Sequence, residues 1–171
     1  PVQSDGKGFS PTMLSALFTW HLVASVASQL PIARLLNRFS RVRGLMLSAL
    51  FWAFSFVVIW LTGVAPFGNV LWAIAAMGVT ALATVTYTPA AASIVVDMAP
   101  PSLRGVYLAV NSQCWAVGYF IGPPLGGWAL DQSPFITHTF WLGMAASVGG
   151  AIAILQILQR ICSKKSEEHH S

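Results

Sequence analysis

The sequence predicts an all-α fold, a polytopic transmembrane helical bundle of five spans. Two observations predict this class. Of the 171 residues, 56% are hydrophobic and only 8% are charged, whereas about a quarter of the residues in soluble domains are charged. The charged residues also leave four uncharged runs, at 8–33, 44–96, 105–130 and 132–159. Because roughly 20 apolar residues cross the hydrocarbon core, three runs hold one span each and the longest run holds two.

The five spans follow one another near 11–33, 44–63, 69–97, 103–130 and 134–160. The stretch "GVAPFGN" (63–69) forms the turn inside the longest run, since its glycines and proline break helical geometry and Asn69 can cap the next helix. We expect an extracytoplasmic segment at 1–10, the five-span bundle at 11–160 and a cytoplasmic tail at 161–171. Because Pro1 is not an initiator methionine, we expect the chain to be part of a longer polypeptide.

The basic residues predict the orientation of the bundle, because cytoplasmic loops carry an excess of Lys and Arg. If the spans alternate in direction, all basic residues except Lys7 lie on one side. These are Arg34, Arg38, Arg41, Arg43, Arg104, Arg160, Lys164 and Lys165. We therefore expect a multi-pass protein of the cell membrane (plasma or inner membrane), with the start of this segment outside and its end in the cytoplasm. The net charge of +4 follows from this topology, so we expect the lipid bilayer as a partner and no nucleic acid.

The cysteines and histidines predict no metal site and no cofactor. Cys114 lies in a span and Cys162 at a cytoplasmic helix end, so the two are too far apart to pair. No zinc-ligand spacing occurs, and His169 and His170 form too short a pair to hold a metal. No Ser–His or paired-Asp constellation falls at membrane depth, so we expect no enzymatic activity.

Two spans carry a polar stripe along one helical face. In the first span the stripe has the spacing i, i+4, i+7, i+8 at His21, Ser25, Ser28 and Gln29, and in the third it recurs at Thr80, Thr84, Tyr87 and Thr88. Polar side chains at membrane depth usually face other helices or a water-filled cavity. Two alternatives stay open. The hydroxyls can instead form hydrogen bonds to the backbone of their own helix, and His21 can instead form a structural hydrogen bond to a neighbouring helix.

The fourth span adds Asn111 and Gln113, which point about 200° apart at 100° per residue, so both cannot fully face one cavity. The resulting candidates for a substrate cavity are His21, Ser25, Gln29, Thr80, Thr84, Tyr87, Asn111 and Gln113. By contrast, "LSALFWAFSFVVIWL" (47–61) is apolar nearly all round, and the fifth span is similarly uniform. We expect spans one, three and four to face an interior, and spans two and five to shield them from lipid.

The fourth span also contains "GYFIGPPLGG" (118–127), an unusual run for a membrane helix. Gly118, Gly122 and Gly126 recur at i, i+4 and i+8, so one side of the helix lacks side chains and lets another helix approach backbone to backbone. Pro123 and Pro124 have no N–H groups, which leaves two carbonyls without helical donors. We expect a bent, compliant helix with a smooth flank.

Three motifs carry a resemblance to the major facilitator superfamily. "GYFIGPPLGG" resembles the G-x-x-x-G-P-x-x-G-G core of the family's antiporter-type motif, with Ala109 at the upstream glycine position. "ARLLNRFSRVRGL" (33–45) is similar to the family's G-x-L-x-D-R-x-G-R-R loop, although Ala33 and Ser40 replace glycines and Asn37 replaces the acid. "DMAPPSLRG" (97–105) resembles the acid–proline–RG connection between the tenth and eleventh spans. Their order implies spans eight to twelve of a twelve-span transporter.

The resemblance implies secondary active transport of a small molecule by alternating access, in which two six-helix bundles rock around a central site. Proton-coupled efflux is one form that this transport can take, with H⁺ as a second partner. The missing amino-terminal bundle is then the partner of the smooth flank. The interface and gating residues implied are Gly118, Gly122, Pro123, Pro124, Gly126 and Gly127.

The resemblance also implies a cytoplasmic charge clamp among Arg38, Arg41, Asp97 and Arg104. We expect Asp97 to pair with Arg38 or Arg41 and to hold the cytoplasmic helix ends together in one transport state. The alternative for Asp97 is a solvated charge at a helix end, and for Arg104 a role in orientation alone.

Two other interpretations stay open. The substitutions at Asn37 and Ser40 also suit a non-transporting membrane module, such as a sensor, scaffold or assembly factor. A half-transporter that dimerises is less compatible with five spans, because the six-helix repeat would lack its first member. The residues do not identify the substrate, the coupling ion or the direction of transport.

Overall fold

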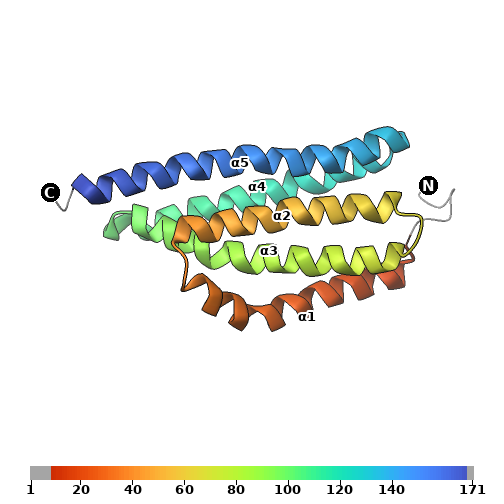
Figure 1. The fold of residues 1–171 in the computed structure, drawn as a ribbon, viewed down its shortest axis with the longest axis horizontal. Coiled ribbons are helices and arrows are strands. Elements are labelled where there is room, and N and C mark those ends of the chain that lie inside the picture. Colours follow the sequence, from red (N-terminus) through yellow and green to blue (C-terminus); the bar gives the residue numbers. More distant parts are fainter. Residues whose placement is uncertain (1–8, 169–171) are drawn as a thin grey trace.

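The described part of the chain folds into five long α-helices that lie along one common axis (Figure 1). The computed structural model describes the backbone of residues 9–168, with the side chains of all of these except 130, 134, 138, 158 and 161–168. The helices are α1 (Pro11–Leu36), α2 (Arg41–Val64), α3 (Asn69–Met98), α4 (Arg104–Leu130) and α5 (Pro134–Glu168), with a 3₁₀ turn η1 (Pro101–Leu103) before α4. The described residues form no strand. The predicted all-α helical bundle is therefore confirmed.

Local sequence explains where the helices begin. Ser10 and Ser40 cap α1 and α2, since the hydroxyl of each accepts a hydrogen bond from the backbone three residues later, at 3.2 Å from Met13 N and 3.4 Å from Arg43 N. Helix α3 follows Gly68, whose φ of 76° is a left-handed conformation that favours glycine. The turn expected at 63–69 thus lies between α2 and α3.

Four of the described helices are long and apolar enough to cross a membrane: 11–36, 41–64, 69–98 and 135–157. Helix α4 is not among these four, since Asn111, Gln113 and its glycines and prolines lower its mean hydropathy. The count of five spans therefore stays a prediction, as do the sides on which segments 1–10 and 161–171 lie. Helix α5 continues to Glu168, into the range expected to be a tail. Residues 1–8 and 169–171, with His169 and His170, lie outside the described residues, as does the side chain of Cys162.

Helices α2 and α3 form the most extensive helix–helix contact of the described chain. Small side chains fill it: Ser48 and Ser55 of α2 are buried, as are Ala76 and Ala83 of α3. The Ser48 hydroxyl donates to the carbonyl oxygen of Ala83 at 2.9 Å. This arrangement is typical of membrane helices, where small residues let two backbones approach.

Helix α2 lies between α3 and α5, because its second large contact is with α5. We expected this span, apolar nearly all round, to be a shield at the lipid boundary. Its Phe54 is indeed exposed, but its serine face forms the centre of the packing. The two serine hydroxyls mark the face of α2 that is buried. Hydrophobicity alone does not identify that face, because lipid tails are as apolar as Leu side chains.

Candidate functional site

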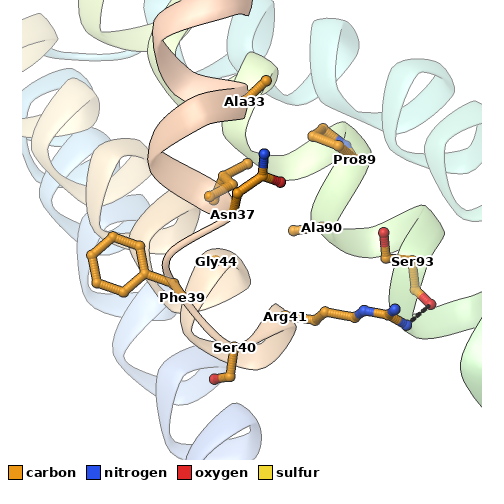
Figure 2. A pocket seen from close by; sticks show the side chains of 10 residues that line it. Ala33, Asn37, Phe39, Ser40, Arg41, Gly44, Pro89, Ala90 and Ser93 are labelled. Carbon is orange, nitrogen blue, oxygen red and sulfur yellow. Dashed lines mark hydrogen bonds between the residues drawn. The ribbon is translucent and has the colours of Figure 1, made fainter.

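A polar cavity lies where the α1–α2 connection meets the carboxyl-terminal part of α3 (Figure 2). Its volume is about 370 Å³. Figure 2 shows Asn37 from the end of α1 and Pro89 and Ser93 from α3 on its walls, with Arg41 extending from the start of α2 toward Ser93. We call it the Arg41 cavity.

Arg41 connects the beginning of α2 to the end of α3. Its guanidinium forms an ion pair with the Asp97 carboxylate, and its Nη1 also donates to the carbonyl oxygen of Ser93 at 3.2 Å. The side chains of Arg41 and Asp97 are 51% and 54% exposed, so water screens the pair and its net contribution to stability is about 0–1 kcal/mol. A weak, exposed pair of this kind opens and closes readily.

The other predicted clamp residues do not join this ion pair within the described chain. Arg38 is exposed in the α1–α2 connection, and Arg104 is exposed at the start of α4. Among the described side chains, the ion-pair partner of Asp97 is Arg41. A role of this pair in a transport state stays a prediction.

Gly44 allows α2 to approach the ends of α1 and α3 closely beside this cavity. A Cβ atom at this position would lie 3.1 Å from Leu36 Cδ2 and 3.3 Å from Ala90 Cβ. These distances are shorter than ordinary van der Waals contact, so the crossing depends on the missing side chain. Gly44 therefore sets the position of the α2 amino terminus, and with it that of Arg41.

Two adjacent side chains of α1 bond to the backbone of α3. His21 Nδ1 lies 3.2 Å from the carbonyl oxygen of Met77, and because a carbonyl can only accept, this nitrogen carries the proton of the contact. Trp20 Nε1 donates to the carbonyl oxygen of Ile74 at 3.0 Å. Gly78 lies beside the indole, with its hypothetical Cβ 3.7 Å from Trp20 Nε1. His21 thus makes the structural hydrogen bond given above as its alternative. Trp20 was not among our candidates.

The hydroxyls of both polar stripes bond to their own helices. Ser25 donates to the carbonyl oxygen of His21 at 2.8 Å, and Thr84 to that of Thr80 at 3.0 Å. Thr80 bonds to the carbonyl of Ala76 at 2.8 Å and also lies 2.5 Å from the Ser55 hydroxyl of α2. Back-bonding of Ser and Thr to the carbonyl at i−4 is common in helices. These donors are therefore engaged, and Thr80 contacts α2.

A larger, apolar cavity of about 640 Å³ lies near the middle of helices α2 to α5, and we call it the central cavity. An aromatic group borders it: the Tyr87 and Trp115 rings meet edge to face at 5.1 Å, and Trp115 stacks on Tyr119 at 5.6 Å. Its lining residues are Leu45, Ser48, Ala49, Trp52, Phe56, Tyr87, Cys114, Trp115, Gly118, Val148, Ala151, Ile154 and Leu155. None of these side chains carries a charge.

The eight substrate-cavity candidates do not converge on one cavity. Tyr87 lines the central cavity, whereas Asn111 lines another of about 410 Å³ with Val95, Val106, Tyr107 and Val110. Gln113 is exposed on α4 and lines neither. The five candidates of α1 and of the threonine stripe line none of these three cavities. Their assignment to a substrate path stays a prediction.

Helix α4 is the least tightly held of the long helices, with few contacts to α3 and α5. It remains helical through Pro123 and Pro124. A Cβ atom at Gly118, Gly122, Gly126 or Gly127 would meet nothing within 4 Å among the described residues. Gly118 lines the central cavity, so the first glycine of the flank faces helices of this chain. The flank is open, and what covers it stays a prediction.

Comparison with known proteins identifies the family. The model of the Major Facilitator Superfamily matches residues 2–169, which is nearly the whole chain. Neither the curated proteins nor the solved structures give a significant match. The helical fold, the four membrane-length helices and this match agree with one another. The chain therefore belongs to the Major Facilitator Superfamily, whose members transport small solutes across membranes.

Proposed function

We propose that this chain is the carboxyl-terminal part of a secondary active transporter, corresponding to spans eight to twelve, which moves a small molecule across the cell membrane by alternating access. The open flank of α4 carries the proposal. A Cβ atom added at Gly122, Gly126 or Gly127 would meet nothing within 4 Å among the described residues, and the nearby Phe120 and Trp128 are 83% and 57% exposed. Helix association in lipid depends on close packing at small residues, so this flank suits a companion bundle.

The companion that we propose is the amino-terminal bundle of the same transporter. A glycine surface packs closely against another helix and still permits sliding, because it has no side chains that interlock with the partner. Pro123 and Pro124 add compliance, since the helix lacks two backbone hydrogen bonds there. Such an interface fits a transporter whose two halves rock against each other.

The Arg41–Asp97 pair is our candidate for a gate at one end of this bundle. The basic residues of the α1–α2 connection lie at the same end of the bundle as this ion pair. The positive-inside rule therefore favours the cytoplasmic side for that end. Opening of an exposed ion pair costs about 0–1 kcal/mol, which suits a contact that forms in one transport state and breaks in the other.

The specific form of transport that we propose is export of the small molecule in exchange for protons. The G-x-x-x-G-P-x-x-G-G pattern at 118–127 supports export. His21 supports proton coupling, because it is an ionisable side chain near the middle of α1, away from Arg34 in the last turn, and its Nε2 makes no hydrogen bond within the described residues.

Transport by the complete natural chain tests the proposal. The chain is reconstituted in liposomes with a pH gradient, and movement of a panel of small solutes is followed together with internal pH. We expect Gly122→Leu and Gly126→Leu to slow transport by about tenfold or more, equivalent to about 1.4 kcal/mol in the barrier. Gly149→Leu on α5 is the matched control, since a Cβ atom at this position also meets nothing within 4 Å among the described residues.

The outcomes separate the alternatives. Normal transport by both flank variants would remove the glycine interface from the mechanism. A well-folded chain that moves no solute of the panel would favour the non-transporting module.

A further inference from the structure

We infer that the bundle binds an anionic phospholipid at the end where α1 finishes and α2 begins. Arg34 and Arg43 bind the phosphate of its headgroup, and an exposed apolar strip on each of these two helices contacts its acyl chains. This lipid partner goes beyond the proposed transport function, and its binding is measured without transport.

Arg34 and Arg43 are exposed cations without an acidic partner in the described chain. Neither guanidinium forms an ion pair or a hydrogen bond with another described side chain. Asp97, the acidic side chain described at this end of the bundle, already pairs with Arg41. The end of α1 and the start of α2 also lie close together, because only residues 37–40 separate the two helices. Both charges are therefore available to one anionic partner.

Arg43 continues an exposed apolar strip along α2. Leu50 and Phe54 are more than half exposed, and at about 100° per residue they lie within about 20° of Arg43 around the helix axis. Ser55, on the side that contacts α3, and Phe56, on the side that contacts α5, lie about 120° and 140° from Arg43 in opposite directions. The strip therefore faces away from both helices that pack most extensively against α2.

Arg34 ends a similar strip on α1. Val23 and Leu30 are more than half exposed, and they lie about 20° and 40° from Arg34 around the helix axis. His21, which bonds to α3, lies about 140° from Arg34. Both α1 and α2 pack against α3 (Figure 1), so the two strips point away from this shared neighbour.

The length of each strip matches one leaflet of a bilayer. Arg34 and Val23 are eleven residues apart, as are Arg43 and Phe54, which corresponds to about 16 Å along a helix. One leaflet is half of a hydrocarbon core of about 30 Å. A cation at the end of a leaflet-long apolar strip matches the two parts of a phospholipid, whose phosphate lies at the membrane surface and whose acyl chains lie below it.

The size of the side chains favours lipid over another protein helix as the partner of the α2 strip. Close helix contacts within a bilayer use small residues, as the α2–α3 contact does through Ser48 and Ser55. On the strip, by contrast, Leu47, Leu50 and Phe54 are all bulky. Fluid acyl chains adapt to such an uneven surface, whereas a rigid helix does not.

The two unpaired charges favour an anionic headgroup over a zwitterionic one. A phosphatidylcholine headgroup brings its own cation, which leaves the guanidiniums without a net counter-charge. Each Arg or Lys near an anionic membrane surface contributes about fivefold in affinity. We therefore expect a marked preference for phosphatidylglycerol.

The test counts bound lipid on the complete natural chain. The chain is purified in a neutral detergent and titrated with dioleoylphosphatidylglycerol or dioleoylphosphatidylcholine, and native mass spectrometry resolves each bound molecule. We expect phosphatidylglycerol to bind its first site at least about tenfold more tightly than phosphatidylcholine does. Glycerol phosphate, which is the headgroup without acyl chains, should not displace it. No solute flux enters this measurement, so its failure and failure of the proposed function are distinguishable.

Arg34→Gln and Arg43→Gln should each weaken binding of phosphatidylglycerol about fivefold and leave phosphatidylcholine binding unchanged. Arg43→Lys keeps the charge and should keep the preference. Arg104→Gln is the matched control, since it removes an exposed charge at the same end of the bundle. Arg104 shares its side of α4 with the half-buried Asn111 and Trp115 and not with an exposed apolar strip. Binding by this variant should change less than about twofold.

Three results would overturn the inference. Equal affinity of the wild-type chain for the two lipids would remove the role of the charges. Displacement of phosphatidylglycerol by glycerol phosphate would identify a site for a free phosphate. The third result is a lower unfolding temperature of Arg34→Gln/Arg43→Gln in detergent without added lipid. It would show that the arginines pair with another part of the complete chain, and size-exclusion chromatography of each variant separates this result from misfolding.

Discussion

Arg41, the first residue of α2, forms an ion pair with Asp97, the next-to-last residue of α3. The same guanidinium donates to the carbonyl of Ser93 one turn earlier in α3. The two contacts hold one end of the α2–α3 pair together from outside its packed core. Because both side chains are about half exposed, the contact contributes little to folding and is free to respond to a conformational change.

Neutralising either partner is expected to affect transport more than stability. Arg41→Gln and Asp97→Asn should each lower the free energy of unfolding by no more than about 1 kcal/mol, while transport falls markedly. The exchanged variant Arg41→Asp/Asp97→Arg should recover transport. Arg38→Gln is the control, since Arg38 lies three residues before Arg41, in the α1–α2 connection, and Asp97 pairs with Arg41. Thermal unfolding and solute flux, measured on the same preparations, check these expectations. Failure of the exchange at normal expression would argue against a gating pair.

Gly44→Ala should destabilise the bundle, because the new methyl group would lie 3.1 Å from Leu36 Cδ2 and 3.3 Å from Ala90 Cβ. Overpacking of a tight contact costs about 1–3 kcal/mol. Gly143→Ala on α5 is the control, since its methyl group meets nothing within 4 Å and alanine favours the helix over glycine by about 1 kcal/mol. Denaturation midpoints in detergent should move in opposite directions for the two variants. Equal midpoints would show that α1 and α3 yield at this crossing without cost.

The sequence predicts the helices well because each depends on local patterns. Uncharged runs mark the membrane-length segments, and the 63–69 turn follows from its glycines and proline. The periodicity also shows which residues share a helical face, since it measures angles around one axis. It does not show which neighbour that face meets. Ser48 and Ser55 belong to a span that is apolar nearly all round, yet they lie in the main helix contact.

The candidate site was harder to predict for the same reason. His21 and Thr80 share a polar character, but one bonds to the Met77 carbonyl and the other contacts Ser55. Trp20 was missed, although its indole N–H needs a partner in lipid and Gly78 opposite provides the space. The central cavity was not foreseen, because its lining is apolar and comes from four helices. Such a void depends on the distances between helices.

Trp20→Phe should weaken the α1–α3 contact by removing the indole N–H that donates to the Ile74 carbonyl at 3.0 Å. Loss of one such hydrogen bond typically costs about 0.5–1.5 kcal/mol. Trp128→Phe is the control: Trp128 is 57% exposed on α4, and its indole makes no hydrogen bond within the described residues. Hydrogen exchange of the α1 backbone amides should accelerate in the first variant only. Equal exchange in both would show that the ring of Trp20, and not its N–H, holds α1 in place.

The Ser55 and Thr80 hydroxyls, 2.5 Å apart, should be energetically coupled. Ser55 is fully buried and Thr80 also bonds to the Ala76 carbonyl, so Ser55→Ala leaves Thr80 with one remaining partner, and Thr80→Val leaves the Ser55 hydroxyl buried without this partner. We expect each single substitution to cost about 1 kcal/mol. The double variant should cost less than the sum of the two, with a coupling energy of about 0.5 kcal/mol or more. Unfolding free energies of the four chains give this coupling directly.

A second cycle with Ser55→Ala and Thr84→Val is the control, since Thr84 bonds within its own helix to the Thr80 carbonyl. Additive costs in the first cycle would mean that the two hydroxyls are neighbours without a mutual hydrogen bond.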